Sequence, residues 1–193
     1  AVTAETTFKP KKTSGSTEVK FTFDATSLRG KTIVVFEELY QDNLKLAVHT
    51  DIEDEDQTIY FPEIKTTAKD ANTDSNLSLA GKEVTLVDTV TYKNLLPEKE
   101  YVMTGTLMDK ETGEAVVIDD KKVTAETTFT PETTEGTVDV QFTFDGSTLA
   151  GKTVVVFESI SYEGKEFAVH ADLKDEGQTI YFPEIKTTAK DNV

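Results

Sequence analysis

TVDVQFTF, residues 137–144, alternates apolar and polar side chains. Successive side chains of an extended chain point to opposite sides, so this period of two predicts a β-strand with one buried face. The predicted buried face carries the apolar side chains of this stretch, Val138, Val140, Phe142 and Phe144.

Other short runs along the chain have the same strand character. EYVMTGTLM, KTVVVFESI and QTIYFPEI are rich in Val, Thr, Phe, Tyr and Ile, which favour strands. The segments between the runs, such as PETTEG and DGSTLAG, supply the Gly, Pro and Asp that turns require. Seven or more strands in about 120 residues predict an all-β fold, an antiparallel β-sandwich of immunoglobulin-like type.

The sequence repeats itself after 121 residues. Val2–Asp70 aligns with Val123–Asp191 without a gap, and about 43 of the 69 paired residues are identical. A period this long indicates whole domains in tandem. The joint between repeats, YFPEIKTTAKD, has no Gly- or Ser-rich linker, so we expect a stiff end-to-end connection. The predicted domains are residues 1–63 (the C-terminal part of one repeat), 64–184 (a complete repeat) and 185–193 (the start of a following repeat).

The charge and the residue content exclude several classes of function. A formal net charge of −16 repels nucleic acid and anionic membrane surfaces. Without cysteine, the chain forms no disulfide and offers no thiolate for catalysis or metal binding. No apolar run has the length of a membrane span. We therefore expect neither nucleic-acid binding nor membrane insertion.

Two motifs resemble ligand sites but lie in the wrong context. A phosphate-loop pattern over residues 146–153 is followed by a strand-like run, where such a loop requires a helix. DLKDEGQTIYFPE resembles a calcium loop, but Lys174 occupies a ligand position. One histidine per repeat, with scattered carboxylates, makes a weak zinc site. We therefore expect no cofactor and no metal ion.

The two histidines keep the same distance from a glutamine. His49 precedes Gln57 by eight residues, and His170 precedes Gln178 by eight. A lone histidine in a strand often has only a structural role. In AVHADLKDEGQ, however, the imidazole and the amide flank a tight acidic turn, so two antiparallel strands would bring them close together. Imidazole is the usual general base near neutral pH.

Several motifs, taken together, resemble those of one known family. That family is the VaFE repeats of Gram-positive surface-anchored adhesins, and the motifs are DTVTY (88–92), GTLMDK (105–110), TGE (112–114), VTAETTFTP (123–131), VVFE (155–158) and HADLKDEGQTI (170–180). The resemblance covers the complete repeat nearly end to end, and the matching half of the first repeat. Such repeats are similar to immunoglobulin-like adhesin domains in which an ester bond joins a threonine of the first strand to a glutamine of the last.

The resemblance implies an autocatalytic cross-link and assigns residues to it. The bond would run from the Thr89 hydroxyl to the side-chain carbonyl of Gln178 and would release ammonia. His170 matches the histidine of the family, while Asp109 and Glu158 match its paired acids. The imidazole would take the hydroxyl proton. A carboxyl that stays protonated beside another would hydrogen-bond the developing oxyanion.

Two further assignments follow from the same resemblance. Thr91 is the alternative nucleophile, because it faces the same side of its strand as Thr89. In the first, partial repeat, the residues equivalent to the site are Glu37, His49 and Gln57.

The resemblance also implies a structural function. We predict an extracellular stalk or spacer repeat of an adhesin on the bacterial cell wall, protected by the ester bond against force and protease. Its partners would be neighbouring repeats of the same chain, with any host ligand bound by a tip domain outside this stretch. The reaction is self-directed and occurs once, so the protein would not be an enzyme. A host-ligand-binding adhesin module is the alternative function.

Overall fold

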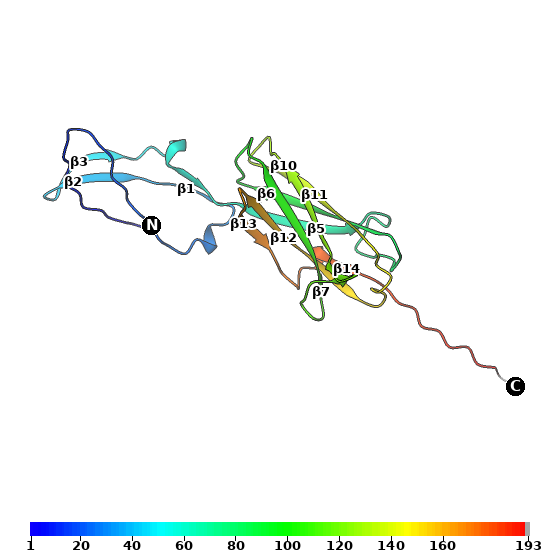
Figure 1. Cartoon of the computed structure of the whole chain (residues 1–193). Helices are drawn as coiled ribbons and strands as arrows, with labels where there is room; N and C mark the ends of the chain where they lie inside the picture. The colour runs from blue at the N-terminus through cyan, green and yellow to red at the C-terminus, as the bar shows by residue number, and fades with distance from the viewer. Residues whose placement is uncertain (192–193) are drawn as a thin grey trace.

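The computed structural model describes residues 1–191, and the part from β5 to β14 forms an antiparallel β-sandwich (Figure 1). One sheet has the strand order β11–β6–β5. β5 pairs with β6 along its whole length and is the first strand of the sandwich, at the edge of this sheet. The strands of this sheet are β5 (Glu63–Asp70), β6 (Val84–Lys93) and β11 (Glu135–Phe144).

The second sheet has the order β10–β7–β12–β13, and the short last strand β14 also pairs with β12. All of these pairings are antiparallel. A small hairpin of β8 and β9 lies outside both sheets. The bounds are β7 (Tyr101–Asp109), β8 (Val117–Ile118), β9 (Lys121–Lys122), β10 (Thr124–Phe129), β12 (Thr153–Tyr162), β13 (Lys165–His170) and β14 (Thr179–Tyr181).

The core lies between the two sheets and confirms the predicted all-β sandwich. In β11, Val140 and Phe142 are buried, Val138 and Phe144 are half-buried, and the polar residues between them are exposed. The alternation predicted for residues 137–144 is therefore confirmed. Both sheets contribute fully buried apolar side chains, among them Leu86, Val90, Met103, Leu107, Val154, Val156 and Ile160.

The first repeat forms less structure than the second. Its strands are β1 (Thr32–Val34), β2 (Glu37–Gln41), β3 (Leu44–His49) and β4 (Thr58–Tyr60); β1 pairs with β4, and β2 with β3. None of residues 1–63 is buried. Residues 2–23 form no strand, although the equivalent residues 123–144 form β10 and β11. In the second repeat, β10 pairs with β7 and β11 pairs with β6. Residues 1–63 contain no strand equivalent to β7 or to β6.

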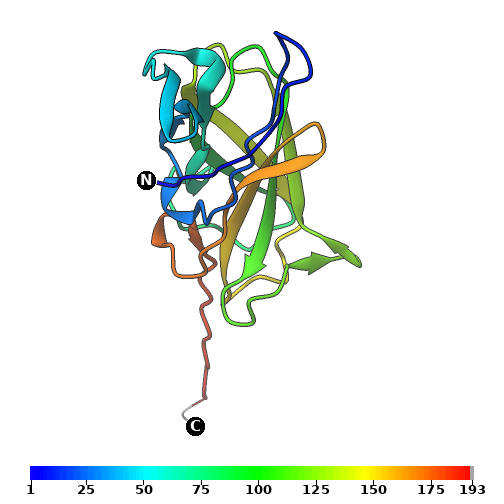
Figure 2. The same ribbon diagram turned by 90° about the vertical axis from the view of Figure 1, so that its left-hand side faces the viewer.

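The two repeats meet directly. β4 ends at Tyr60 and β5 begins at Glu63, so no flexible linker separates them. Asn94, which follows β6, donates from Nδ2 to the carbonyl oxygens of Lys31 (3.0 Å) and Phe61 (3.3 Å) in the first repeat. Figure 1 shows the first repeat at one end of the sandwich and the C-terminal segment running away from the other, and in Figure 2 the end that carries the first repeat faces the viewer.

Helical structure among the described residues is limited to short 3₁₀ turns. None of the described helices is long and apolar enough to cross a membrane. The turns are η1 (Thr26–Leu28), η2 (Glu55–Gln57) and η3 (Glu176–Gln178).

Candidate functional site

A group of buried polar atoms between the two sheets lacks hydrogen-bond partners. Among the described residues, the buried side-chain oxygens without a partner are Thr66 Oγ1, Asp88 Oδ2, Glu158 Oε1 and Oε2, and Gln178 Oε1. Buried polar groups are normally paired, because an unpaired group loses its hydration without compensation. Orphaned atoms on four side chains therefore point to a site with a purpose other than stability.

Both sheets contribute to the site. On β5, Thr66 is on the same side as Ala68, which is directly opposite Asp88 on β6. Thr66 and Asp88 are therefore diagonal neighbours on the inner face of this sheet, within reach of one another across the strand pair. Glu158 belongs to β12 of the other sheet and is 1% exposed. The sandwich thus places a hydroxyl and two carboxyls together in its buried interior, between the two sheets.

Gln178 enters this space from the end of η3. Its side chain is fully buried, and its Nε2 donates to Asp88 Oδ1 at 3.1 Å. The turn that ends in Gln178 packs against β5: a Cβ atom on Gly177 would lie 3.8 Å from the Thr66 carbonyl oxygen. The carboxamide is therefore held by its nitrogen, while its carbonyl oxygen has no hydrogen-bond partner.

His170 lies beside this group at the end of β13. It is directly opposite Glu158 in the β12–β13 register, and its Nε2 lies 2.7 Å from Asp175 Oδ2. The other oxygen of Asp175 accepts the backbone N–H of Gly177 at 2.8 Å, which caps η3. One aspartate therefore fixes both the imidazole and the turn that carries Gln178.

The two buried carboxyls cannot both ionise easily. Burial raises the pKa of Asp88. Burial, followed by the neighbouring Asp88 carboxyl, raises the pKa of Glu158 to about 11. The Thr66 hydroxyl opposes this rise in the pKa of Glu158, although the two side chains make no hydrogen bond of good geometry. The pair therefore retains a proton at neutral pH and can donate a hydrogen bond to a nearby oxygen.

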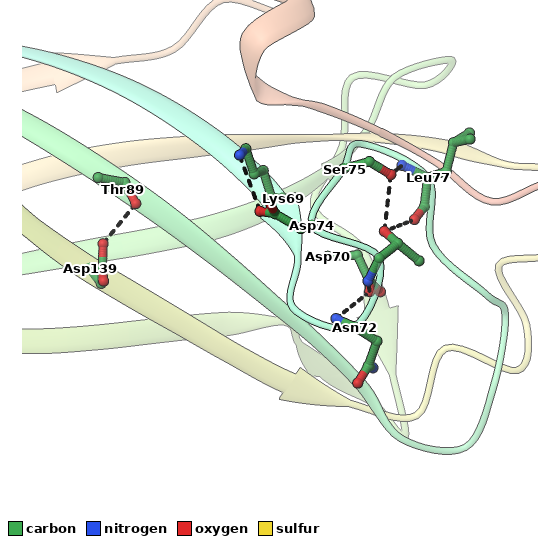
Figure 3. Close-up of polar contacts among 9 residues, drawn as sticks. Lys69, Asp70, Asn72, Asp74, Ser75, Leu77, Thr89 and Asp139 are labelled. Atoms are coloured by element: carbon green, nitrogen blue, oxygen red, sulfur yellow. Dashed lines mark hydrogen bonds and ion pairs between the residues drawn. The ribbon is translucent and has the colours of Figure 1, made fainter.

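The structure does not bring Thr89 or Thr91 to Gln178. Both threonines are exposed on the outer face of β6, and the Thr89 hydroxyl donates to Asp139 Oδ1 at 2.7 Å (Figure 3). Side chains alternate along a strand, so the inward position of Asp88 turns Thr89 outward. The threonine that lies on the inner face of the first strand is Thr66.

Asp109 also lies away from the site. It ends β7, where its Oδ1 accepts the backbone N–H groups of Glu111 (2.9 Å) and Thr112 (3.1 Å), and its Oδ2 lies 3.6 Å from Lys152 Nζ. This carboxylate shapes a turn. The acid next to Glu158 is Asp88.

The structure brings together three of the residues expected from the sequence: His170, Glu158 and Gln178. Sequence reasoning missed Thr66 and Asp88. A signal for both was present. Asp88 begins the DTVTY motif, and Thr66 lies in EIKTTAKD, which directly follows the last strand of the preceding repeat.

The first repeat reproduces the local geometry of the site but not its enclosure. Glu37 is directly opposite His49, and His49 Nε2 lies 2.7 Å from Asp54 Oδ2. Gln57 is only half-buried, and His49 is exposed. No described residue occupies the position of Asp88 in this repeat. No group of three or more His, Asp or Glu side chains in residues 1–191 is arranged to hold a metal ion.

Residues 1–61 and 62–182 each match the family model of the T-Q ester bond containing domain. The chain belongs to this family. The match confirms the resemblance to ester-forming adhesin repeats that the sequence motifs indicated. It also fits the tandem arrangement, because each copy of the T-Q ester bond domain ends shortly after its own glutamine, Gln57 or Gln178.

A solved structure of similar fold is that of an adhesin. The chain resembles a bacterial adhesin from Mobiluncus mulieris that contains intramolecular disulfide, isopeptide and ester bond cross-links, with 17% identity and a TM-score of 0.51 over 64% of this chain and 57% of the adhesin chain. A second crystal form of that adhesin aligns with 18% identity and a TM-score of 0.48, over 62% and 56% of the respective chains. This chain thus spans little more than half the length of the adhesin. The comparison with curated proteins gave no match.

Proposed function

We propose that the sandwich is a load-bearing repeat of a bacterial surface adhesin, closed by an ester bond that it forms itself between Thr66 and Gln178. The observation that carries this proposal is the burial of an unpaired hydroxyl on the first strand of the sandwich and an unpaired amide carbonyl immediately before its last strand, beside a carboxyl pair. Membership of the T-Q ester bond family supports it.

The reaction needs no reactant from outside the fold. Thr66 Oγ1 attacks the side-chain carbonyl carbon of Gln178, and the hydroxyl proton passes to His170 as general base. The proton held by Asp88 and Glu158 supplies a hydrogen bond to the oxyanion of the tetrahedral intermediate. The carbon–nitrogen bond then breaks, and the amide nitrogen leaves as ammonia after taking a proton from the imidazolium. One carbon–oxygen bond replaces one carbon–nitrogen bond.

The fold supplies what this difficult reaction needs. An alcohol and a primary amide do not react at a useful rate in water, but fixed neighbours gain a large effective concentration. Glu158 and Gln178 are at most 1% exposed, so water has little access to the ester once it has formed. The reaction occurs once in each domain, so the protein acts on itself and is not an enzyme.

The placement of the bond suits a stalk that carries tension. Thr66 is on the first strand and Gln178 immediately precedes the last, so the ester bypasses nearly the whole domain. Thr66 follows Gln57, the equivalent glutamine of the first repeat, by only nine residues (66 − 57). Tension would therefore pass from one ester to the next through a short extended segment. The direct junction and the Asn94 hydrogen bonds across it suit a stiff chain of repeats, whose neighbours are its partners at the cell surface.

Pulling the chain by its two ends tests this proposal. In the wild-type protein the ester carries the force, so the 111 residues between Thr66 and Gln178 (67–177) should never extend. Thr66→Val should release them in one step on the order of 350 Å long. Thr67→Val is the matched control, because Thr67 is the next residue of β5 and is exposed; it should behave as wild type. A wild-type protein that extends as far as Thr66→Val would contradict the proposal.

The carboxyl pair makes the stability of the uncross-linked domain depend on pH. With its pKa raised from 4.5 to about 11, Glu158 keeps a proton in the folded state that the unfolded chain releases. Its contribution to stability is complete below pH 4.5 and is lost as the pH rises toward 11. In a Thr66→Val background, the free energy of unfolding should fall by up to about 1.4 kcal/mol per pH unit from this group. Adding Glu158→Gln should remove that slope in denaturant titrations, and an unchanged slope would contradict the assignment.

A further inference from the structure

Lys110 connects two segments that are far apart in the sequence. It directly follows β7, and its Nζ donates to Glu176 Oε1 at 2.8 Å and to Thr179 Oγ1 at 2.9 Å. Glu176 begins η3 and Thr179 begins β14, so the two acceptors flank Gln178. The lysine side chain is 25% exposed and that of Glu176 is 69% exposed, so the ion pair is open to water, whereas the contact with the fully buried Thr179 is shielded.

The turn that Lys110 holds carries two parts of the site. Thr179 is fully buried, and its hydroxyl donates to the Asp175 carbonyl oxygen at 2.7 Å. Asp175 in turn contacts His170 at 2.7 Å. A displacement of residues 175–179 would therefore move both the Gln178 carboxamide and the carboxylate that orients the imidazole.

Backbone hydrogen bonds at the end of β7 fix the position of Lys110. Its backbone N–H donates to the Thr153 carbonyl oxygen at 3.0 Å. Asp109 accepts the next two backbone N–H groups and so fixes the direction in which the chain leaves β7. This gives the GTLMDK motif a role that involves its last residue, although its aspartate lies outside the site.

We infer that Lys110 is a positioning residue for ester formation, which fixes the Asp175–Thr179 turn so that the Gln178 carbonyl stays in reach of the Thr66 hydroxyl. The inference rests on the proposed cross-link. An ammonium group that donates to one residue on each side of Gln178 restricts the turn in two directions. Reactions between fixed neighbours are sensitive to small displacements, and an error of about 1 Å lowers the rate by up to about 100-fold.

The rate of ammonia loss tests the inference. The full chain is isolated unfolded in urea from inclusion bodies, diluted into buffer, and followed by intact mass. Lys110→Met, which keeps the length of the aliphatic stem, should form the ester about tenfold more slowly. The shape of its pH–rate profile should match that of wild type, because Lys110 transfers no proton. Lys110→Arg, which keeps the charge and the donors, should restore the rate to within about threefold.

Matched variants separate positioning from general stability. Lys152→Met is the control, because Lys152 is at the same end of the sandwich and its Nζ lies 3.6 Å from Asp109; its rate should equal that of wild type. In a Gln178→Ala background, Lys110→Met should leave the unfolding midpoint within about 4 °C. If the unfolding midpoint drops by more than this and ester formation is slow, Lys110 has a structural role and the inference is overturned. Thr179→Val removes, at constant volume, one acceptor of Lys110 together with the hydroxyl's bond to the Asp175 carbonyl oxygen; it should also slow the reaction and serves as the test if Lys110→Met does not fold.

The possible failures are distinguishable. If the wild-type chain loses ammonia and Lys110→Met does so at the same rate, the positioning role is overturned and the cross-link stands. If the wild-type chain loses no ammonia, the cross-link fails, and the role of Lys110 fails with it.

Discussion

Thr66→Ala is expected to leave the denatured protein at the full mass of its sequence, whereas the wild-type chain should weigh one ammonia less. The hydroxyl oxygen of Thr66 is one of the two bonded atoms, so its removal abolishes the bond. A noncovalent contact is lost on unfolding, but an ester survives it. Intact-mass measurement in denaturant therefore decides the matter, and a protease digest should yield one branched peptide that contains both Thr66 and Gln178.

The controls for this result come from neighbouring threonines. Thr67→Ala, Thr89→Ala and Thr91→Ala should all keep the mass deficit, because these side chains are exposed on the outer face of their sheet. Thr66→Ser should keep it as well, since it retains the hydroxyl. If the deficit persists in Thr66→Ala and disappears in Thr89→Ala, the sequence-based assignment of Thr89 was correct and the present one is not.

Loss of the bond should also lower stability. The ester closes a loop of about 110 residues, and loop-closure entropy gives such a cross-link a stabilisation of about 5 kcal/mol. Thr66→Ala should therefore unfold at lower denaturant concentration and be cut sooner by protease than Thr67→Ala.

His170→Ala is expected to slow ester formation by a factor of about 10² to 10⁴ without unfolding the domain. The imidazole side chain is 24% exposed at the end of β13, so its removal leaves no cavity in the core. What is lost is the group that takes the proton from Thr66. The time course of ammonia loss after dilution from urea measures this effect, and circular dichroism reports the fold.

The chain provides its own control for His170. His49→Ala removes the equivalent imidazole of the first repeat, which has the same aspartate contact but is not next to a closed site. It should not alter the rate. A normal rate in His170→Ala would assign the histidine a structural role and move the general base elsewhere.

The family resemblance assigned His170, Glu158 and Gln178 to the site, and the constant spacing of the histidine and the glutamine is visible in the residues alone. His170, Glu158 and Gln178 are all inside or directly beside the space between the sheets, as expected. The spacing was informative because β12, β13 and β14 are consecutive and their connections are short (residues 163–164 and 171–178), so short-range geometry brings these side chains together. Long-range pairing was not needed to find them.

The nucleophile and the second acid depended on long-range pairing. The resemblance implies a threonine on the first strand and, through Thr89, assigns DTVTY to that strand. The structure shows that β5 precedes it and that DTVTY belongs to β6. The alternation in VTLVDTVTY already places Asp88 with the buried Leu86 and Val90, and Thr89 on the opposite face. Which of the two faces meets Gln178 follows only from the packing of the sheets.

One octapeptide separates what the sequence determined from what the tertiary structure decided. EIKTTAKD occurs twice, at residues 63–70 and 184–191. Its composition and alternation make it competent to form a strand in both places. The first copy is β5, where Ile64 is 5% exposed, whereas the second forms no strand and Ile185 is 88% exposed. The first copy has two neighbours. β6 hydrogen-bonds its backbone, and the opposite sheet covers its apolar face. A strand exists only where a neighbour satisfies its backbone and buries its side chains, and identical residues cannot specify that neighbour.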